Sequence, residues 1–344
     1  MKLAFSEEQR MLAQSVRDVL AKECTPAVVR AAWTGESGRS PALWKTLAEQ
    51  GIVGLTAPEA HGGLGLSEVD LALVLEEAGR AALPEPLLET TAVAIPLLTA
   101  LGGAAAAAWL PRLTAGEAIA TVGLGSAAYV SDAHIADLLL LERAGEWHAL
   151  TRERVKLTAQ HGVDGAQRQF RVEWSPAADT LVASGPIAAR ASAQAFDRGA
   201  WAAAAILCGL AARLIETTVE YAKTRQQFGV PIGSFQAVKH HLTNAKLGLE
   251  FARPVVWRAA DSLARGDTET SLHVSMAKHY ASEAAMGAAR AALQCHGAIG
   301  YSFEYDLHLW MKRAWTLAAA WGDAAWHRAR VAAAILPPVE NAHG

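Results

Sequence analysis

Two features of the sequence carry residue types that could do chemistry by themselves. His240 and His241 are metal-ligand residues, and the loop at 58–65, Pro-Glu-Ala-His-Gly-Gly-Leu-Gly, has the glycine content of a phosphate cradle. Adjacent positions on a helix point to different sides and no third ligand follows at i+4, so solvated or interface histidines are favoured over a metal site. The loop lacks the Lys-Ser/Thr pair that follows in a P-loop, so a structural turn is favoured there.

The sequence before residue 115, which contains the loop, has a helical pattern. Ser6, with acidic residues directly after it, reads as an N-cap, and the apolar residues that follow recur at helical spacing. We expect helices at about 6–22, 41–50 and 67–79.

The periodicity changes in the middle of the chain. Between 118 and 187, short apolar runs alternate with Gly, Asp, Ser and Pro, which predicts strands at 118–124, 136–141, 147–150 and 169–174. After Pro186 the helical pattern returns and continues to about 336, which predicts about four long helices. Pro254, inside one of them, predicts a kink or a break.

Composition excludes several classes of protein. The 344 residues are 52% hydrophobic and carry a net charge of -3, which predicts a folded chain without broad attraction to nucleic acid. Three scattered cysteines rule out a disulfide framework and fit a reducing cytoplasm. Asp197, Arg198 and Arg213 interrupt the apolar stretch at 191–215, so we expect a buried helix and no membrane span. The high apolar content, with 11 tryptophans, favours an oligomer.

Three motifs of the C-terminal half stand in a fixed order: YAKTRQQFG at 221–229, IGSFQ at 232–236 and QCHGAIGY at 294–301. This set resembles the acyl-CoA dehydrogenase family, whose hallmarks are an R-x-x-F-G turn, a following F-Q, and a Q-x-x-G-G-x-G-[YF] loop. The N-terminal half agrees through SEEQ at 6–9 and LEEAGR at 75–80. The resemblance covers nearly the whole chain, apart from a weak and shortened middle.

The resemblance implies an α+β fold that is mostly α. It comprises an N-terminal helical domain at 1–115, a small, reduced middle β domain at 116–188 and a C-terminal four-helix bundle at 189–344. It also implies FAD bound near a dimer interface and removal of two hydrogens from an acyl-CoA thioester. In the family a carboxylate takes the C2 proton while the flavin accepts hydride from C3. That base must be close to C2 and partly desolvated, and the flavin must be held rigidly.

The resemblance assigns contacts to the ADP half of an FAD whose flavin ring lies on a neighbouring subunit. The matching residues are Arg225, Phe228, Gln236, Gln294, Gly297 and Ala298. Taken alone, Arg225 could be a cation that caps a turn, and Gly297 could permit a sharp loop between helices. The ordered set of motifs favours cofactor binding instead. Ala298 replaces a usual second glycine. Cys295 and His296 lie inside this loop, which disfavours a cysteine nucleophile.

The catalytic base of the family has no match. One branch places a glutamate where this chain has Trp321, and another places it where this chain has Gly199. An indole cannot take a proton from carbon. Asp323 and Asp197 are the nearest carboxylates, and each is expected to be an N-terminal or surface charge. The middle region also lacks a stretch between 121–126 and 129–133, which predicts loss of the flavin cradle.

Our leading hypothesis is therefore a smaller, non-catalytic subunit of a heteromeric acyl-CoA dehydrogenase. Two such chains would pair with two larger homologues as an α2β2 tetramer, share FAD, act on an acyl-CoA with a bulky steroid side chain, and pass electrons to an electron-transfer flavoprotein. Two alternatives stay open. One is a self-sufficient homotetramer that uses Asp323 or Asp197 as base, and the other is a non-enzymatic scaffold of the same fold.

Overall fold

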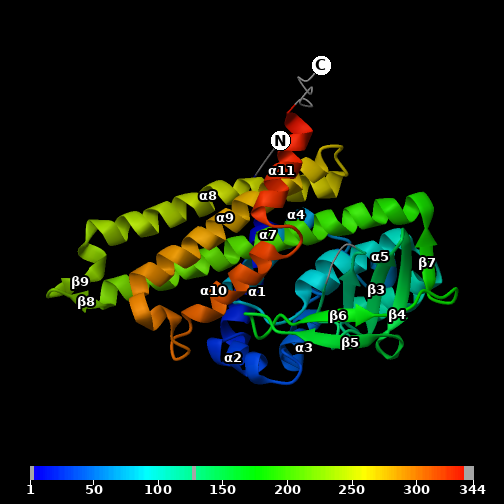
Figure 1. The fold of residues 1–344 in the computed structure, drawn as a ribbon, viewed down its shortest axis with the longest axis horizontal. Helices are drawn as coiled ribbons and strands as arrows, with labels where there is room; N and C mark the ends of the chain where they lie inside the picture. The colour runs from blue at the N-terminus through cyan, green and yellow to red at the C-terminus, as the bar shows by residue number, and fades with distance from the viewer. Residues whose placement is uncertain (1–3, 126–128, 337–344) are drawn as a thin grey trace, which may run out of the picture.

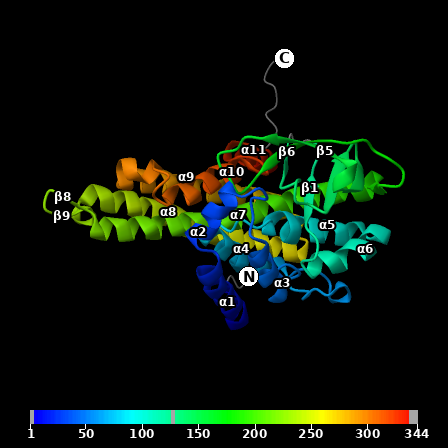
Figure 2. The same ribbon diagram turned by 90° about the horizontal axis from the view of Figure 1, so that it is seen from below.

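The chain, described by a computed structural model over residues 4–125 and 129–336, runs from helices through strands back to helices (Figure 1). Strands of the middle region lie at one end of the long C-terminal helices, and the small hairpin β8–β9 lies at the opposite end. Seen from below, helices α1, α3 and α4 lie on one side of α7, and α10 and α11 lie on the other (Figure 2). The predicted α+β, mostly helical fold is confirmed.

The N-terminal helices begin where the sequence provides caps. They are α1 (Glu7–Glu23), α2 (Pro26–Thr34), α3 (Pro41–Glu49), α4 (Glu68–Arg80), a π-helical segment (Leu88–Ala94), α5 (Ile95–Leu101) and α6 (Gly103–Thr114). The Ser6 hydroxyl accepts from the backbone N–H of Gln9 at 3.2 Å, and the Gln9 side chain accepts from Ser6 in return at 2.9 Å. This is a capping box. The three predicted helices are confirmed, whereas α2, the π-helical segment, α5 and α6 were not predicted.

The loop at 58–65 is a packed turn, as predicted. It contains a single 3-10 turn at Glu59–His61, and Gly62 follows with φ of 81°. A Cβ on Gly63 would lie 2.1 Å from the carbonyl oxygen of Ala57, so the backbone fits there only without a side chain. The glycines therefore serve close packing.

The middle region forms two small sheets. One has the order β1 (Ala120–Gly123), β3 (Leu138–Arg143), β4 (Glu146–Thr151), β7 (Leu181–Ser184), with β1 and β3 parallel and the other pairs antiparallel. The other has the order β2 (Val130–Ser131), β6 (Gln169–Glu173), β5 (Lys156–Gln160). The strands expected from apolar runs are confirmed at β1, β3, β4 and β6. The other three strands are short or exposed and carry little apolar signal.

The C-terminal helices are α7 (Gly185–Thr224), α8 (Gln236–Arg265), α9 (Thr270–His296), α10 (Leu307–Ala319) and α11 (Ala324–Ile335). Helix α7 is long and apolar enough to cross a membrane, but 72% of its most apolar window is buried inside this structure. It is the core helix of the bundle. Helix α8 runs through Pro254 as one element, so the predicted break did not occur. Buried Leu249, Ala252 and Val256 hold the helix by packing on both sides of that residue.

Helices α4 and α7 cross with their backbones in contact. A Cβ on Gly209 of α7 would lie 1.8 Å from the carbonyl oxygen of Glu76, and one on Gly79 of α4 would lie 2.1 Å from that of Ile206. Two glycines that face each other across the crossing allow this approach. The N-terminal and C-terminal helices therefore share one core.

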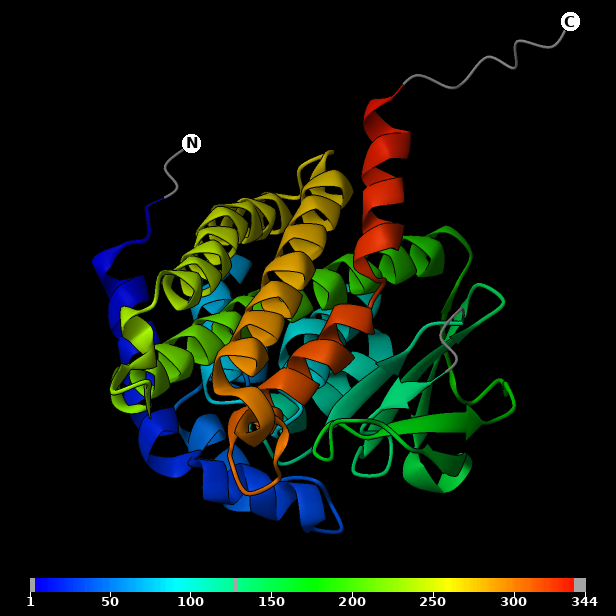
Figure 3. The same cartoon turned by 60° about the vertical axis from the view of Figure 1, so that its left-hand side comes forward.

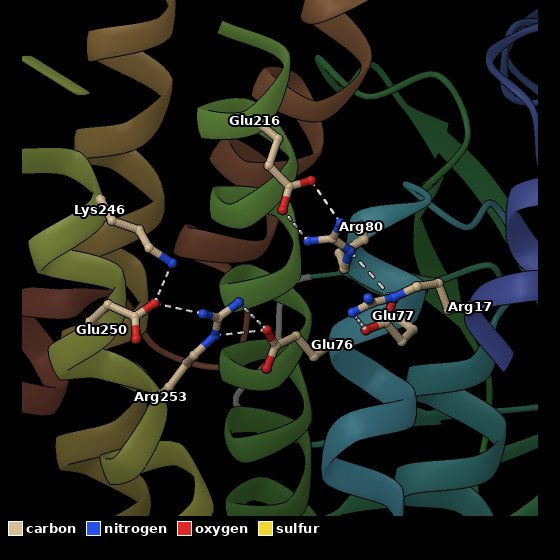
Figure 4. A network of polar contacts seen from close by, with 8 residues as sticks. All are labelled: Arg17, Glu76, Glu77, Arg80, Glu216, Lys246, Glu250 and Arg253. Atoms are coloured by element: carbon tan, nitrogen blue, oxygen red, sulfur yellow. Dashed lines mark hydrogen bonds and ion pairs between the residues drawn. The ribbon is translucent and has the colours of Figure 1, made fainter. Parts of the chain in front are cut away.

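A polar network surrounds that crossing and joins four helices (Figure 4). Arg17 of α1 and Arg80 of α4 hold the carboxylate of Glu77, and Arg253 of α8 reaches Glu76 at 2.6 Å. The remaining members are Glu216 on α7, and Lys246 and Glu250 on α8. Burial raises the pKa of Glu76, and the Arg253 guanidinium opposes that rise. The arginines thus compensate two buried carboxylates at the helix crossing.

Candidate functional site

The R-x-x-F-G motif forms the turn at the end of the bundle farthest from the sheets (Figure 1). Arg225 is the C-cap of α7 and is exposed. Strands β8 (Gln226–Gln227) and β9 (Val230–Pro231) pair as a hairpin, and its turn residues Phe228 and Gly229 have φ of 54° and 79°. Positive φ at both positions is the geometry of a type I′ turn. The ring of Phe228 is 93% exposed at the tip.

The other predicted cofactor residues lie at the ends of neighbouring helices. Gln236 begins α8, and Gln294 lies in the last turn of α9; both are exposed. Gly297 ends α9 with φ of 65°, and a Cβ on it would meet nothing within 4 Å. Ala298 follows and is exposed. The backbone at Gly297 is thus open to a ligand.

A stacked pair joins these two helix ends. Tyr221 in the last turn of α7 stacks on His296, the last residue of α9, with ring centroids 4.2 Å apart. His296 Nδ1 donates to the carbonyl of Ala292 at 2.8 Å, its Nε2 lies 3.2 Å from the Tyr305 hydroxyl, and burial lowers its pKa. Burial also raises the pKa of Cys295. In the described part of the chain no hydrogen bond pairs Cys295 with His296, so the thiol is not activated.

His240 and His241 are both exposed on α8. Within residues 4–125 and 129–336, no group of three or more His, Cys, Asp or Glu side chains could hold a metal ion. The two histidines are therefore surface residues of the bundle in this chain.

The two positions where the family places its base contact each other. A Cβ on Gly199 of α7 would lie 2.3 Å from Cδ2 of the Trp321 ring, closer than any real side-chain contact. Trp321 lies in the turn between α10 and α11 with φ of 56°. Phe196 packs against it with ring centroids 6.3 Å apart. One indole therefore occupies the space at both base positions, and no carboxylate stands at either.

The two carboxylates considered as substitutes have structural partners. Asp323 is the N-cap of α11 and accepts from the backbone N–H of Trp326 at 2.7 Å, which confirms its helix-terminal role. Asp197 is only 4% exposed, so its interpretation as a surface charge was wrong. It accepts from Ser271 Oγ at 2.5 Å and from Arg330 at 2.7 Å, and these two partners compensate its burial.

A cavity of about 620 Å³ lies beside Trp321, between the strands and helices α10 and α11. Helix α10 lies between α9 and the strands, as Figure 3 shows. The cavity has an aromatic wall and a polar wall, made chiefly by Phe196, Trp321, Trp326, Glu89, Ser131 and Gln169. The strands β1, β2 and β6 thus border a cavity in the region where the sequence predicted loss of the flavin cradle.

Two residues that sequence reasoning missed hold the Trp321 turn. Lys278 of α9 is fully buried, and its Nζ donates to the carbonyls of Ala318 and Gly322 at 3.1 and 2.9 Å; burial lowers its pKa to about 7. His327 Nε2 donates to the carbonyl of Trp321 at 2.8 Å, and burial lowers its pKa to about 4. The available signal was a lysine on the same helical face as small and apolar residues of α9.

Comparisons with known proteins identify the family. The N-terminal domain of acyl-CoA dehydrogenases matches residues 6–117, and their C-terminal domain matches residues 189–336. The acyl-CoA dehydrogenase IpdE2 of Mycobacterium tuberculosis is 38% identical over 309 residues, which cover 90% of this chain and 91% of IpdE2. The chain belongs to the acyl-CoA dehydrogenase family.

Solved structures share the whole fold of this acyl-CoA dehydrogenase chain. The Tcur3481–Tcur3483 steroid ACAD, solved as a variant, is 25% identical with a TM-score of 0.85, covering 95% of this chain and 97% of that one. The ChsE4–ChsE5 complex of Mycobacterium tuberculosis is 23% identical with a TM-score of 0.86, covering 98% and 100%. The second likeness shows the fold alone.

Members of this family bind FAD, and one end of this chain fits part of that cofactor. Arg225 is exposed at the bundle end, and in the described residues its guanidinium has no hydrogen bond or ion pair. A free guanidinium suits the pyrophosphate of the ADP half, and the open backbone at Gly297 lies at the end of helix α9, which packs on α7. The acid–base half of the chemistry does not fit, because Trp321 occupies the base positions.

Proposed function

We propose that this chain is a non-catalytic subunit of a heteromeric, FAD-dependent acyl-CoA dehydrogenase. A larger homologue supplies the carboxylate base and most of the flavin site, and this chain supplies contacts to the ADP half of the cofactor. The contact between Gly199 and Trp321 carries the proposal, because the indole stands at one base position and fills the space beside the other. A dehydrogenase without a base at C2 does not remove the proton there.

The cofactor side of the proposal rests on the bundle end. Arg225, Phe228 and Gln236 follow the end of α7, while Gln294, Gly297 and Ala298 follow the end of α9. The Tyr221–His296 stack brings these two segments together. Bound FAD would supply the hydride acceptor, and this chain's residues would bind and orient its pyrophosphate and adenosine.

Likeness to known proteins supports the proposed assembly and substrate. A complex of two such chains with two larger partners, in the cytoplasm, with an electron-transfer flavoprotein as acceptor, is the arrangement that we propose. A bulky steroid side-chain CoA ester is the proposed substrate class, supported by the likeness to a steroid ACAD. An apolar groove between α8 and α9 supports the pairing.

Expression with and without a larger homologue tests the proposal. We expect the chain alone to lack acyl-CoA turnover and stoichiometric FAD, and the co-expressed pair to copurify with FAD and activity. Turnover and full FAD content in the isolated chain would instead support a homotetramer. That alternative has little structural support, since Asp323 caps a helix and Asp197 is held by Ser271 and Arg330.

Arg225→Ala separates a cofactor subunit from a scaffold of the same fold. In the co-expressed complex we expect this substitution to weaken FAD binding by about 10-fold or more, because a charged hydrogen bond to phosphate is lost. Flavin absorbance per complex after gel filtration measures it. Arg171→Ala, at an exposed position on β6, is the matched control and should leave FAD content unchanged. Equal FAD content in both variants would favour the scaffold.

A further inference from the structure

A cavity lined by three arginines lies where the N-terminal helices meet the bundle. Its volume is about 290 Å³, and helices α1, α2, α4, α7 and α10 all contribute to its lining. It shares no lining residue with the groove between α8 and α9 or with the cavity beside Trp321. The proposed function therefore gives this cavity no role.

Two glutamates balance two of the three arginines. Both carboxylate oxygens of Glu77 accept from Arg17, at 2.6 and 2.9 Å, and Arg80 holds Glu216 at 2.7 Å (Figure 4). Within the part of the chain that the structure describes, Arg213 forms no ion pair or hydrogen bond, and its Nε is buried without an acceptor. One guanidinium thus leaves the cavity with an uncompensated positive charge.

The unpaired guanidinium is held in position. It lies over the Trp310 ring, 5.4 Å from the ring centroid, and Trp310 Nε1 in turn donates to the carbonyl of Arg80 at 2.8 Å. A guanidinium over an indole face keeps its in-plane N–H groups available to an acceptor. Because Arg213 is already ordered, it loses little conformational freedom when a ligand binds.

A second positive group, the N-terminus of α2, borders the same cavity. Thr25 is the N-cap and Pro26 the first residue of this helix, and both line the cavity. The Thr25 side chain makes no capping hydrogen bond. The backbone N–H groups in the first turn of a helix attract anions. Two groups from distant parts of the chain therefore favour an anion in one space.

The remaining walls are apolar. Leu20 and Ala21 of α1 line the cavity together with the Trp310 ring. Burial raises the pKa of the Cys24 thiol to about 12, so this lining residue adds no negative charge at neutral pH. Apolar walls beside a cationic group suit an anion that carries a short hydrocarbon chain.

We propose that this cavity binds a small organic carboxylate. The carboxylate lies against Arg213 and the N-terminus of α2, and the hydrocarbon chain lies against Leu20 and Trp310. Cofactor and partner take no part, because every residue of the site belongs to this chain. A ligand here joins α2 to α7, so it stabilises the folded chain.

Three matched probes test the site on the full-length chain. They are butyrate, the neutral butyramide and butyl phosphate, titrated at constant ionic strength and followed by the NMR signal of the Arg213 Nε–H group. We expect butyrate to shift this signal saturably, and butyramide to bind at least about 10-fold more weakly because it lacks the charge. Butyl phosphate should bind no more tightly than butyrate, since only one positive charge is unpaired.

Each other result would overturn the proposal. Absence of a saturable butyrate shift, or equal affinity for butyrate and butyramide, would remove the anion site. Tighter binding of butyl phosphate would replace the carboxylate by a phosphate monoester as ligand class. A shift by sodium chloride alone, over the same range of concentration, would show ionic screening only.

Variants place the bound carboxylate, with the rise of the thermal midpoint in butyrate as the measurement. Arg213→Gln should abolish this rise. Arg112→Gln is the matched control, since Arg112 also lies over an indole, 4.8 Å from the Trp109 ring on α6, but outside the cavity. It should keep the full rise. An unchanged rise in Arg213→Gln, or an equal loss in both variants, would contradict the site.

Ala21→Glu provides a test that leaves every arginine in place. Ala21 is exposed on α1 and lines the cavity, so the substitution introduces a carboxylate beside Arg213 without disturbing the core. We expect butyrate affinity to fall by about 10-fold or more, because the new side chain competes for the same positive charge. Undiminished butyrate binding in Ala21→Glu would put the bound carboxylate elsewhere.

Discussion

His327 shows how single buried groups control the Trp321 turn. The imidazole is fully buried and neutral, donates to the Trp321 carbonyl, and has Lys278 and Arg330 as its cationic neighbours. Gly322 packs directly on it, since a Cβ there would lie 2.8 Å from its Nε2. The turn that fills the base positions therefore depends on an uncharged histidine.

Acid should destabilise the chain through this residue. Unfolded histidine takes up a proton near pH 6.5, whereas burial lowers the pKa of His327 to about 4 in the folded chain. Between these values the unfolded state binds more protons, so the free energy of unfolding falls as pH drops from 6.5 to 4, by on the order of 3 kcal/mol. Urea denaturation at pH 7, 5.5 and 4 measures this.

His327→Gln keeps a donor for the Trp321 carbonyl and removes the titration. We expect its stability to fall less than that of the wild type over the same pH range. If both proteins lose the same free energy of unfolding on acidification, His327 is not the titrating group.

For single residues, the sequence predicted which residues form the candidate site better than which residues contact each other. Motif order singled out Arg225 and Gln294, and both lie at the bundle end. The sequence did not predict that Gly199 contacts Trp321, because the contact joins two distant segments through tertiary packing. Asp197 was misjudged for the same reason, since its partners Ser271 and Arg330 come from other helices.

Among the elements, the β8–β9 hairpin carries a residue that its own fold disfavours. Phe228 has positive φ and an exposed ring, and both features are costly for an aromatic residue unless something covers it. Phe228→Asn should leave the thermal midpoint of the isolated chain unchanged or slightly higher, because asparagine suits this turn. The same substitution should lower FAD content or partner recovery in the complex. A drop in the midpoint of the chain alone would show that the ring stabilises the hairpin instead.

The α4–α7 crossing tolerates no added atoms. Gly209→Ala would place a methyl group 1.8 Å from the Glu76 carbonyl oxygen, so we expect a loss of about 1–3 kcal/mol or more in the free energy of unfolding. Gly287→Ala on α9 meets nothing within 4 Å and should raise stability by about 0.5–1 kcal/mol through helix propensity. Urea titration of the two variants of the isolated chain compares them. Similar effects of both substitutions would contradict the close crossing.

Helix boundaries were predicted correctly where the local sequence signal was strong. The Ser6 cap marked the start of α1 correctly, since capping is read from a few adjacent residues. Helix α2 was missed although Pro26 at its first position is a start signal. The continuity of α8 through Pro254 depends on packing that no local pattern contains.

At the scale of the whole molecule, an apolar groove lies between α8 and α9. It has a volume of about 870 Å³, its floor is formed by small residues, and its rim carries Phe251 and Tyr280 at 63% and 49% exposure. An apolar groove of this size, on a chain that lacks a base, suits the bundle of a second acyl-CoA dehydrogenase chain.

Phe251→Asp should therefore weaken assembly by about 10-fold or more, because an anchor in the groove is replaced by a charge. Gel filtration and pull-down of the co-expressed pair measure the change. The isolated variant should fold as the wild type does, since the ring is exposed. Met11→Asp on α1, 65% exposed outside the groove, is the control. Unchanged assembly of Phe251→Asp would remove the groove from the interface.

The contact between Gly199 and Trp321 bears on how reversible the loss of the base is. A glutamate at 199 cannot be accommodated while the indole remains, because even its Cβ would overlap the ring. A glutamate at 321 would enter a turn fitted to an indole and leave the space over Gly199 empty. Each single substitution thus passes through a less stable protein, so the packing opposes the return of a base by one mutation.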